Sequence, residues 1–266
     1  MSTTLFDPSR LHDGVSTGPT LTTRGLGYRH RRRLPGSAHA WELHDVDLTL
    51  RSGTVTGLLG RNGAGKSTLL DLLAGLRRPR TGEILLDGEP VWDAPGPRAA
   101  VTLLGTRRAL LENNRLTDSV ELWRTTRPLW SSTDLAHYLD TFEVNVDCVP
   151  RRLSQGQRSA VDAAFALASH SPVLLLDEVH LGMDAVVRRR FWDALLEQYV
   201  AERATIVIAA HEVAEIEDIV EDVVVLATGT VTAAGSADDL RAACTPPGAP
   251  LADLTDVLEH YSAKGA

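Results

Sequence analysis

Short apolar runs alternate with polar and helical stretches along the 266-residue chain. Runs with strand character occur at 21–28, 43–50, 55–59, 83–87, 173–176 and 205–210. The last two runs are largely apolar, as expected of buried parallel strands. Between them, residues 185–199 have helical spacing with an apolar stripe. The pattern therefore predicts strand–helix–strand units and an α/β fold.

The middle of the chain changes to helical periodicity. Residues 116–127 and 133–142 are predicted helices, and Pro128 breaks the pattern between them. A helix rich in small residues is predicted at 158–169, a closing hairpin around Gly229, and a short helix at 251–261. We expect a mainly parallel core sheet, an N-terminal antiparallel β subdomain and an inserted α-helical subdomain. The expected boundaries are a flexible arm at 1–19, a main domain at 20–245 with its helical part at about 107–157, and a linker with a short helix at 246–266.

Composition and charge narrow the class of protein. Hydrophobic residues make up 43% and charged residues 23%, as in ordinary globular proteins. The net charge of −8 gives no global basic field, so nucleic acid is not an expected partner. The apolar runs are too short to cross a bilayer, and residues 1–10 lack the pattern of a secretion signal. The two cysteines, Cys148 and Cys244, have no metal or redox spacing, which favours a cytoplasmic location.

The most specific motif is residues 60–67, G-R-N-G-A-G-K-S. It matches the phosphate-binding loop G-x-x-x-x-G-K-S, and it stands between a predicted strand and a helical pattern, as that motif requires. Glycines let the backbone N–H groups surround phosphates, and the helix start adds its positive dipole end. Lys66 is expected to pair with the β- and γ-phosphates, and the Ser67 hydroxyl to bind Mg²⁺. The predicted nucleotide-binding residues here are Gly60, Asn62, Gly63, Ala64, Gly65, Lys66, Ser67 and Thr68.

Two carboxylates follow the buried run at 173–176. In parallel sheets, ligands bind at the carboxyl ends of the strands, where Asp177 and Glu178 are expected to lie. Asp177 is predicted to hold Mg²⁺. Glu178 is predicted to be the catalytic residue that polarises the attacking water.

A third motif, L-S-Q-G-Q at 153–157, precedes the predicted helix at 158–169. Ser154 and the Gly156 backbone lie at a helix start, which either caps the helix or binds an anion. Together with the other two motifs, this segment resembles the ATP-binding subunits of ABC transporters, whose signature is L-S-G-G-Q. The resemblance covers about residues 20–240 and implies a P-loop NTPase fold of the ABC type.

The resemblance implies roles for further residues. Ser154, Gly156 and Gln157 would contact ATP as the signature. Asp184 would be the aspartate that couples two sites across a dimer. His211, after the strand at 205–210, would contact the γ-phosphate as a second catalytic residue. Tyr28 is the best match to the aromatic residue that stacks on adenine, and Trp41 is a weaker match.

The resemblance also implies partners. ATP would lie between the phosphate loop of one subunit and the signature of a second ATP-binding subunit, in a homodimer or a heterodimer. A transmembrane permease on a separate chain would use the motion, so the expected location is cytoplasmic, peripheral on the inner face of the cell membrane. Residues 128–130 and 211–217 are similar to those of bacterial drug and antibiotic exporter ATPases, which makes export the expected direction.

The sequence departs from the family at several positions. Thr106 stands where the family has a glutamine that touches Mg²⁺, and Gln155 replaces a signature glycine. Two alternatives therefore remain: a soluble ABC-type ATPase, and a nucleotide-dependent switch with impaired hydrolysis. The first usually carries two cassettes, coiled-coil arms or zinc-binding cysteines, none of which is evident here. The second is favoured by Thr106 and opposed by Glu178 and His211.

Overall fold

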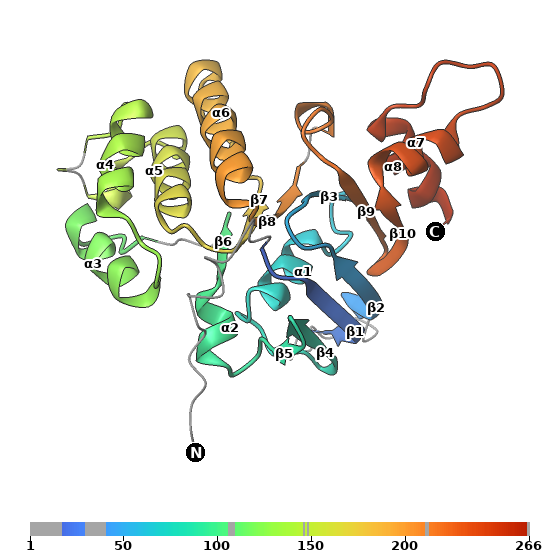
Figure 1. The fold of residues 1–266 in the computed structure, drawn as a ribbon, viewed down its shortest axis with the longest axis horizontal. Helices are drawn as coiled ribbons and strands as arrows, with labels where there is room; N and C mark the ends of the chain where they lie inside the picture. The colour runs from blue at the N-terminus through green and yellow to red at the C-terminus, as the bar shows by residue number, and fades with distance from the viewer. Residues whose placement is uncertain are drawn as a thin grey trace, which may run out of the picture. The chain divides into compact units, whose positions relative to one another are not determined.

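The computed structural model describes residues 18–29, 41–105, 110–145, 147, 149–210 and 213–264 (Figure 1). Its contacts divide the chain into two compact units. One unit contains Pro95–Ala204, with Gly18 at its edge, and the other contains Pro19–Ala94 and Thr205–Ala266. No helix within the described ranges is long and apolar enough to span a membrane.

The unit that contains the N-terminal strands has an antiparallel sheet in the order β2-β1-β4-β5. Its members are β1 (Leu21–Tyr28), β2 (Leu43–Leu50), β4 (Thr81–Leu86) and β5 (Glu89–Pro90). Both neighbours of β1 run antiparallel to it, with Leu21 opposite Leu50 on one side and Leu86 on the other. Buried and exposed residues alternate along much of β2, so one face of this sheet packs on the core.

A second set of strands in this unit carries the phosphate loop. β3 (Val55–Leu59) lies between β8 (Thr205–Ala209) and β9 (Asp222–Ala227) and is parallel to both. All residues of these three strands are buried, which explains why their sequences are mostly apolar. β10 (Thr230–Ser236) returns antiparallel to β9, and residues 60–65 lie between the end of β3 and the start of α1 (Lys66–Leu73).

The C-terminal helices pack on the same unit. α8 (Leu254–Lys264) contacts α7 (Ala237–Cys244), β9, β10 and the 3₁₀ turn η3 (Val213–Glu215). Glu217 accepts a hydrogen bond from the backbone N–H of Leu254 and pairs with Arg241 at 3.3 Å. The guanidinium of Arg241 also donates to the carbonyl of Ala252 at 2.8 Å. This small polar cluster holds the start of α8.

The other unit is mainly helical. It contains the parallel pair β6 (Val101–Leu104) and β7 (Val173–Asp177). Its helices are α2 (Pro95–Ala99), α3 (Leu116–Thr126), α4 (Ser132–Thr141), α5 (Gln155–Ala168) and α6 (Ala185–Glu202), with a 3₁₀ turn η2 at Pro150–Arg152. Figure 1 shows α4, α5 and α6 side by side, with α5 in the middle.

An aromatic cluster joins α5 to the α3–α4 region. The ring of Phe165 on α5 lies 5.4 Å from the rings of both Trp123 and Trp130, measured between centroids. Phe165 is fully buried, so this cluster forms the core between the helices. Residues 160–168 of α5 are all buried, which explains why alanine is so frequent there.

His170 makes a charged link at the far end of α5. Its Nε2 lies 2.7 Å from a carboxylate oxygen of Asp134 on α4, and its Nδ1 lies 2.5 Å from one of Glu202 on α6. The hydrogen bond to Glu202 raises the pKa of His170 above its ordinary value, burial opposes the shift, and Asp134 adds to it. His170 therefore ties three helices together in its protonated form.

The predicted elements agree with the structure in type and differ at their ends. β1, β2 and β3 have the predicted bounds, whereas α5 begins at Gln155 rather than at 158. The predicted strand at 83–87 begins earlier, at Thr81, and the C-terminal helix begins at Leu254 instead of 251. The short helices α2 and α7 are additional to the prediction. The predicted combination of parallel strands, an antiparallel β part and a helical part is present in the structure.

Replacing His170 with glutamine tests the charged link. A raised pKa means that the stabilisation is fully present below the pKa of the unfolded histidine and is lost as the pH rises through the folded one. We expect His170→Gln to lower the free energy of unfolding by on the order of 1 kcal/mol at pH 6, and by much less at pH 9. Thermal melting across this range measures the difference. The control is His137→Gln, because His137 is an exposed histidine on the same helix as Asp134. If the difference in melting temperature between the wild type and His170→Gln did not vary with pH, the account would be contradicted.

Candidate functional site

The phosphate loop joins the end of β3 to the start of α1. Gly63 and Gly65 have positive φ angles of 80° and 107°, which turns the chain sharply before the helix. A Cβ on Gly65 would lie 2.8 Å from a methyl group of Leu43, so this position has no room for a side chain. No side chain caps the start of α1. The backbone N–H groups of the first turn are therefore suited to binding an anion.

Lys66 is buried within this loop. Its side chain donates a hydrogen bond to the carbonyl of Gly60 at 2.6 Å, and the residue is only 7% exposed. The turn before it is closed by a hydrogen bond from the N–H of Ala64 to the carbonyl of Arg61. The Ala64 carbonyl in turn accepts from the N–H of Gly229 in the β9–β10 turn. The loop is thus held in one shape, with an ammonium group at its centre.

The polar side chains of the loop differ in exposure. Asn62 and Ser67 are exposed, and Ser67 lies in the first turn of α1. The hydroxyl of Thr68 donates to the carboxylate of Glu42 at 3.2 Å, so Thr68 is engaged with the neighbouring strand region. Ser67 therefore presents its hydroxyl at the surface beside the loop.

Tyr28, the predicted adenine-stacking residue, ends β1 in the same unit. Its ring is half-buried, and its hydroxyl accepts a hydrogen bond from Arg77 at 3.1 Å. Trp41 is also half-buried and has the Arg29 guanidinium 5.1 Å from its ring centroid. Both aromatic candidates therefore have an arginine against the ring.

Asp177, predicted to hold Mg²⁺, and Glu178, predicted to be catalytic, lie in the other unit, where β7 ends. Asp177 is the last residue of β7 and is 5% exposed. Glu178 follows with a positive φ of 55°, an uncommon conformation for a residue with a side chain. The chain therefore turns sharply between the two residues. Such strain is frequent at functional positions.

The signature segment packs against the loop that follows Glu178. Ser154 and Gln157 form a capping box: the Ser154 hydroxyl accepts from the Gln157 N–H, and the Gln157 side chain accepts from the Ser154 N–H. A Cβ on Gly156 would lie 2.1 Å from the carbonyl oxygen of Gly182, so only glycine allows the two backbones to approach. Ser159 also donates to the carbonyl of Leu181 at 2.8 Å. The two segments form one packed surface.

Asp184 begins α6 at the end of this loop. Its carboxylate accepts hydrogen bonds from the N–H groups of Val186 and Val187 at 2.9 and 3.0 Å. It is a helix cap in the structure and remains exposed. The cap fixes where the loop ends, next to the signature segment.

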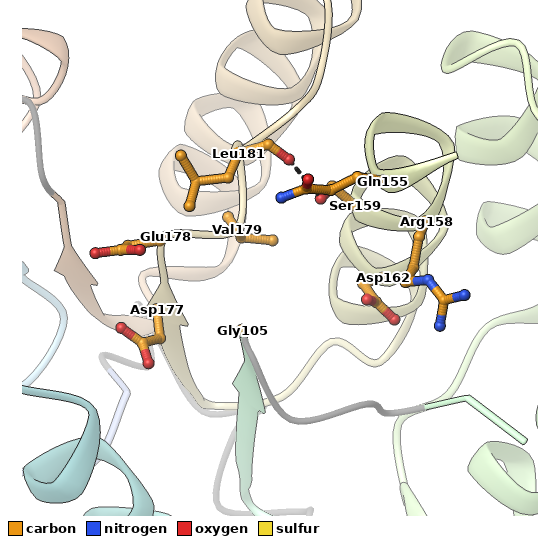
Figure 2. Close-up of a pocket in the computed structure, with 9 residues that line it drawn as sticks. All are labelled: Gly105, Gln155, Arg158, Ser159, Asp162, Asp177, Glu178, Val179 and Leu181. Atoms are coloured by element: carbon orange, nitrogen blue, oxygen red, sulfur yellow. Dashed lines mark hydrogen bonds between the residues drawn. The ribbon is translucent and has the colours of Figure 1, made fainter. Parts of the chain in front are cut away.

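A pocket of about 150 Å³ lies between these elements of the helical unit. Figure 2 shows Asp177 and Glu178 at the end of β7, and Asp162 on α5 across the pocket from them. Asp162 is 7% exposed, and its Oδ1 has no hydrogen-bond partner among the described residues. Burial raises the pKa of Asp162 to about 7, although Arg158 opposes the shift, and Glu112 adds to it. Arg158 itself pairs with Glu112 and with the carbonyl of Pro150.

Sequence reasoning missed Asp162. The available signal was a single acid in the run A-V-D-A-A, where the helical pattern predicts a buried face. The phosphate-loop residues and Tyr28 fall in one unit, and Asp177, Glu178, Asp184 and the signature fall in the other. His211 and Thr106 lie outside the described residues, so their predicted roles stay predictions.

Comparisons with known proteins all point to the same protein family. Residues 43–180 match the family described as ABC transporter. The chain is 32% identical to a probable sulfate/thiosulfate import ATP-binding protein CysA from Chlorella vulgaris, over 74% of this chain and 86% of that protein. It is 30% identical to the methionine import ATP-binding protein MetN of Bradyrhizobium diazoefficiens, of which it spans 60%. It is 32% identical to an ATP-dependent lipid A-core flippase of Alkalilimnicola ehrlichii, over 75% of this chain and 36% of the flippase.

Solved structures show the same fold. One described as the ATP binding subunit of an ABC transporter has a TM-score of 0.77 and 25% identity, and it covers 91% of this chain and 99% of its own. Another is an ATP-binding cassette in a dimeric post-hydrolysis state with ADP and Pi, with a TM-score of 0.71 and 21% identity, covering 81% of this chain and 98% of its own.

The buried acid gives a prediction for stability against pH. Because the folded state holds the Asp162 proton more tightly than the unfolded state, stability falls as the pH rises from about 4 to about 7. Asp162→Asn removes this cost, so we expect it to raise the free energy of unfolding by roughly 4 kcal/mol at pH 8 and by little at pH 4.

Thermal melting at the two pH values measures the effect. Asp140→Asn, at an exposed position on α4, serves as the control. Equal melting temperatures for the wild type and Asp162→Asn at pH 8 would show that the acid is compensated in the folded protein.

Proposed function

Because the chain belongs to the ABC transporter family of ATP-binding proteins, we propose that it hydrolyses ATP to drive a separate transmembrane permease. The chain is an ABC transporter ATPase subunit by this membership. The permease and the direction of transport are the further steps of the proposal. We take export as the direction because residues 128–130 and 211–217 are similar to those of exporter ATPases, while the relatives include importers and a flippase.

One observation supports the proposal most strongly: the shape of the phosphate loop. It places a buried ammonium group and an uncapped helix start at the end of a buried parallel strand. Triphosphates need both a positive charge and several N–H donors within a short span. We propose that Lys66 binds the β- and γ-phosphates and that the N–H groups of residues 63–68 surround them.

The chain also has groups that suit Mg²⁺. Ser67 offers an exposed hydroxyl and Asp177 a buried carboxylate, and hard oxygen ligands of this kind are the ones that Mg²⁺ prefers. We propose these two residues as its protein ligands. The ion, when bound, would neutralise charge on the phosphate oxygens during phosphoryl transfer.

We propose that Glu178 orients and deprotonates the attacking water. Its position directly after Asp177, on a backbone turn with positive φ, supports separate roles for the two carboxylates. His211 is proposed as the contact to the γ-phosphate. Tyr28 is proposed as the platform for the adenine ring.

The proposed site needs a second ATP-binding subunit. We propose that Ser154, Gly156 and Gln157 of one subunit complete the site on the phosphate loop of the other, and that Asp184 links the two sites. The exposure of Ser154, Gln157 and Asp184, and the exposed apolar residues Leu181 and Val186 beside them, support a protein contact here. The dimer proposed is either a homodimer or a pair with a related chain.

ATP turnover tests the catalytic assignment. We expect the purified complex with its permease to hydrolyse ATP, and Glu178→Gln to lower the rate by about 100-fold or more, because the base is lost while the shape is kept. Phosphate release measures the rate, and nucleotide affinity should stay within about threefold of the wild type. The control is Glu197→Gln, at an exposed position on α6. Equal rates for the wild type and Glu178→Gln would refute the role of Glu178.

A further inference from the structure

Three side chains from distant parts of the sequence form a cluster at Tyr28. Arg77 donates a hydrogen bond from its Nη1 to the Tyr28 hydroxyl at 3.1 Å and from its Nε to a carboxylate oxygen of Asp71 at 2.7 Å. Its guanidinium carbon also lies 5.3 Å from the centroid of the Tyr28 ring, within the range of a cation–π contact. We call Asp71, Arg77 and Tyr28 the platform cluster. No role for Asp71 or Arg77 follows from the motifs described above.

The cluster is built more firmly than a surface ion pair. Asp71 is buried, and the Arg77 side chain is 21% exposed. Burial lowers the pKa of Arg77, but the hydrogen bonds to Tyr28 and Asp71 outweigh it, and the pKa lies above its ordinary value. The guanidinium therefore stays charged and is directed by two fixed acceptors, which limits the orientations open to the tyrosine.

The elements involved connect the ring to the phosphate loop. Asp71 lies on α1, the helix that begins at Lys66, and Arg77 follows the end of that helix. Tyr28 is the last residue of β1. All three members belong to the same unit. The helix that starts at the phosphate loop thus also carries the acid that anchors the arginine on the ring.

We propose that Asp71 and Arg77 are positioning residues that hold the Tyr28 ring as a platform, with the nucleotide base stacking on the ring face opposite the guanidinium. This inference rests on the proposed role of Tyr28 in stacking. Every base has a π-face, so stacking on this ring strengthens the binding of any nucleotide and does not select one base over another. Arg77 therefore affects ATP and GTP alike, and a ligand without a base not at all.

Binding of three ligands separates this role from a structural one. The affinities of the purified full chain for ATP, GTP and inorganic tripolyphosphate are measured by displacement of a fluorescent nucleotide. We expect Arg77→Ala to weaken the binding of ATP and GTP about tenfold, because the Tyr28 ring is no longer held in place for stacking, and to leave tripolyphosphate binding within about twofold. Arg78→Ala is the matched control, because Arg78 is the adjacent arginine and is exposed.

Two milder variants keep the test valid if Arg77→Ala folds poorly. Tyr28→Phe keeps the ring and removes the hydroxyl acceptor, and Asp71→Asn keeps the shape and removes the charge. We expect each to weaken ATP binding less than Tyr28→Ala does, with tripolyphosphate binding unchanged.

The outcomes separate this inference from the proposed function. The inference is supported if Arg77→Ala and Tyr28→Ala lower the affinity for ATP and GTP but not for tripolyphosphate, while Arg78→Ala changes none of the three affinities. If Tyr28→Ala lowers the affinity for ATP but Arg77→Ala does not, the stacking role of Tyr28 stands and the inference is wrong. If Arg77→Ala lowers the affinity for tripolyphosphate as much as that for ATP, the effect is structural and the inference is also wrong. If Trp41→Ala lowers the affinity for ATP and Tyr28→Ala does not, Trp41 is the stacking residue and the proposed role of Tyr28 is wrong.

Discussion

The buried ammonium group of Lys66 sets the main constraint on the phosphate loop. Burying a charge costs several kcal/mol unless hydrogen bonds and opposite charge offset the loss of water. The Gly60 carbonyl supplies one such bond at 2.6 Å, which requires β3 to end and the loop to return over it. The β9–β10 turn then holds the loop through the hydrogen bond from Gly229 to Ala64. The buried charge, the close packing at Gly65 and the hydrogen bond from the closing hairpin therefore act together to fix the shape of the loop.

In the helical unit, the contacts of α5 fix the position of its first turn, which carries the signature segment. α5 is fixed at both ends: by the Ser154–Gln157 capping box where it begins, and by the hydrogen bond from Gln198 to the Leu167 carbonyl near its end. Phe165 packs against two tryptophans between these points. Close backbone contact at Gly156 then joins the helix start to the loop after Glu178. A change in one of these segments is expected to move the other.

The elements that could be predicted from the sequence are those marked by residues close together in the chain. β1, β2 and β3 have the predicted bounds because each is a short run of strand-like residues flanked by polar residues or glycine. α2 contains Pro95, Gly96 and Pro97, which are poor helix formers, so the sequence pattern does not indicate this helix. The helical spacing at 158–169 marks only the later part of α5, which begins at Gln155 after the Ser154 cap. Motifs located the phosphate loop, the carboxylates and the signature. The Arg77–Tyr28 contact spans 49 positions and leaves no local pattern, so only the structure reveals it.

The central claim is that the phosphate loop of one chain works with the signature of another. Sedimentation velocity of Glu178→Gln chains with and without ATP and Mg²⁺ tests it most directly. The account predicts monomers without ATP, dimers with ATP, and no ATP-dependent dimers when Ser154→Arg is added, although each Ser154→Arg chain still binds ATP. Chains that bind ATP and stay monomeric at high concentration, or dimers that are unaffected by Ser154→Arg, would contradict it.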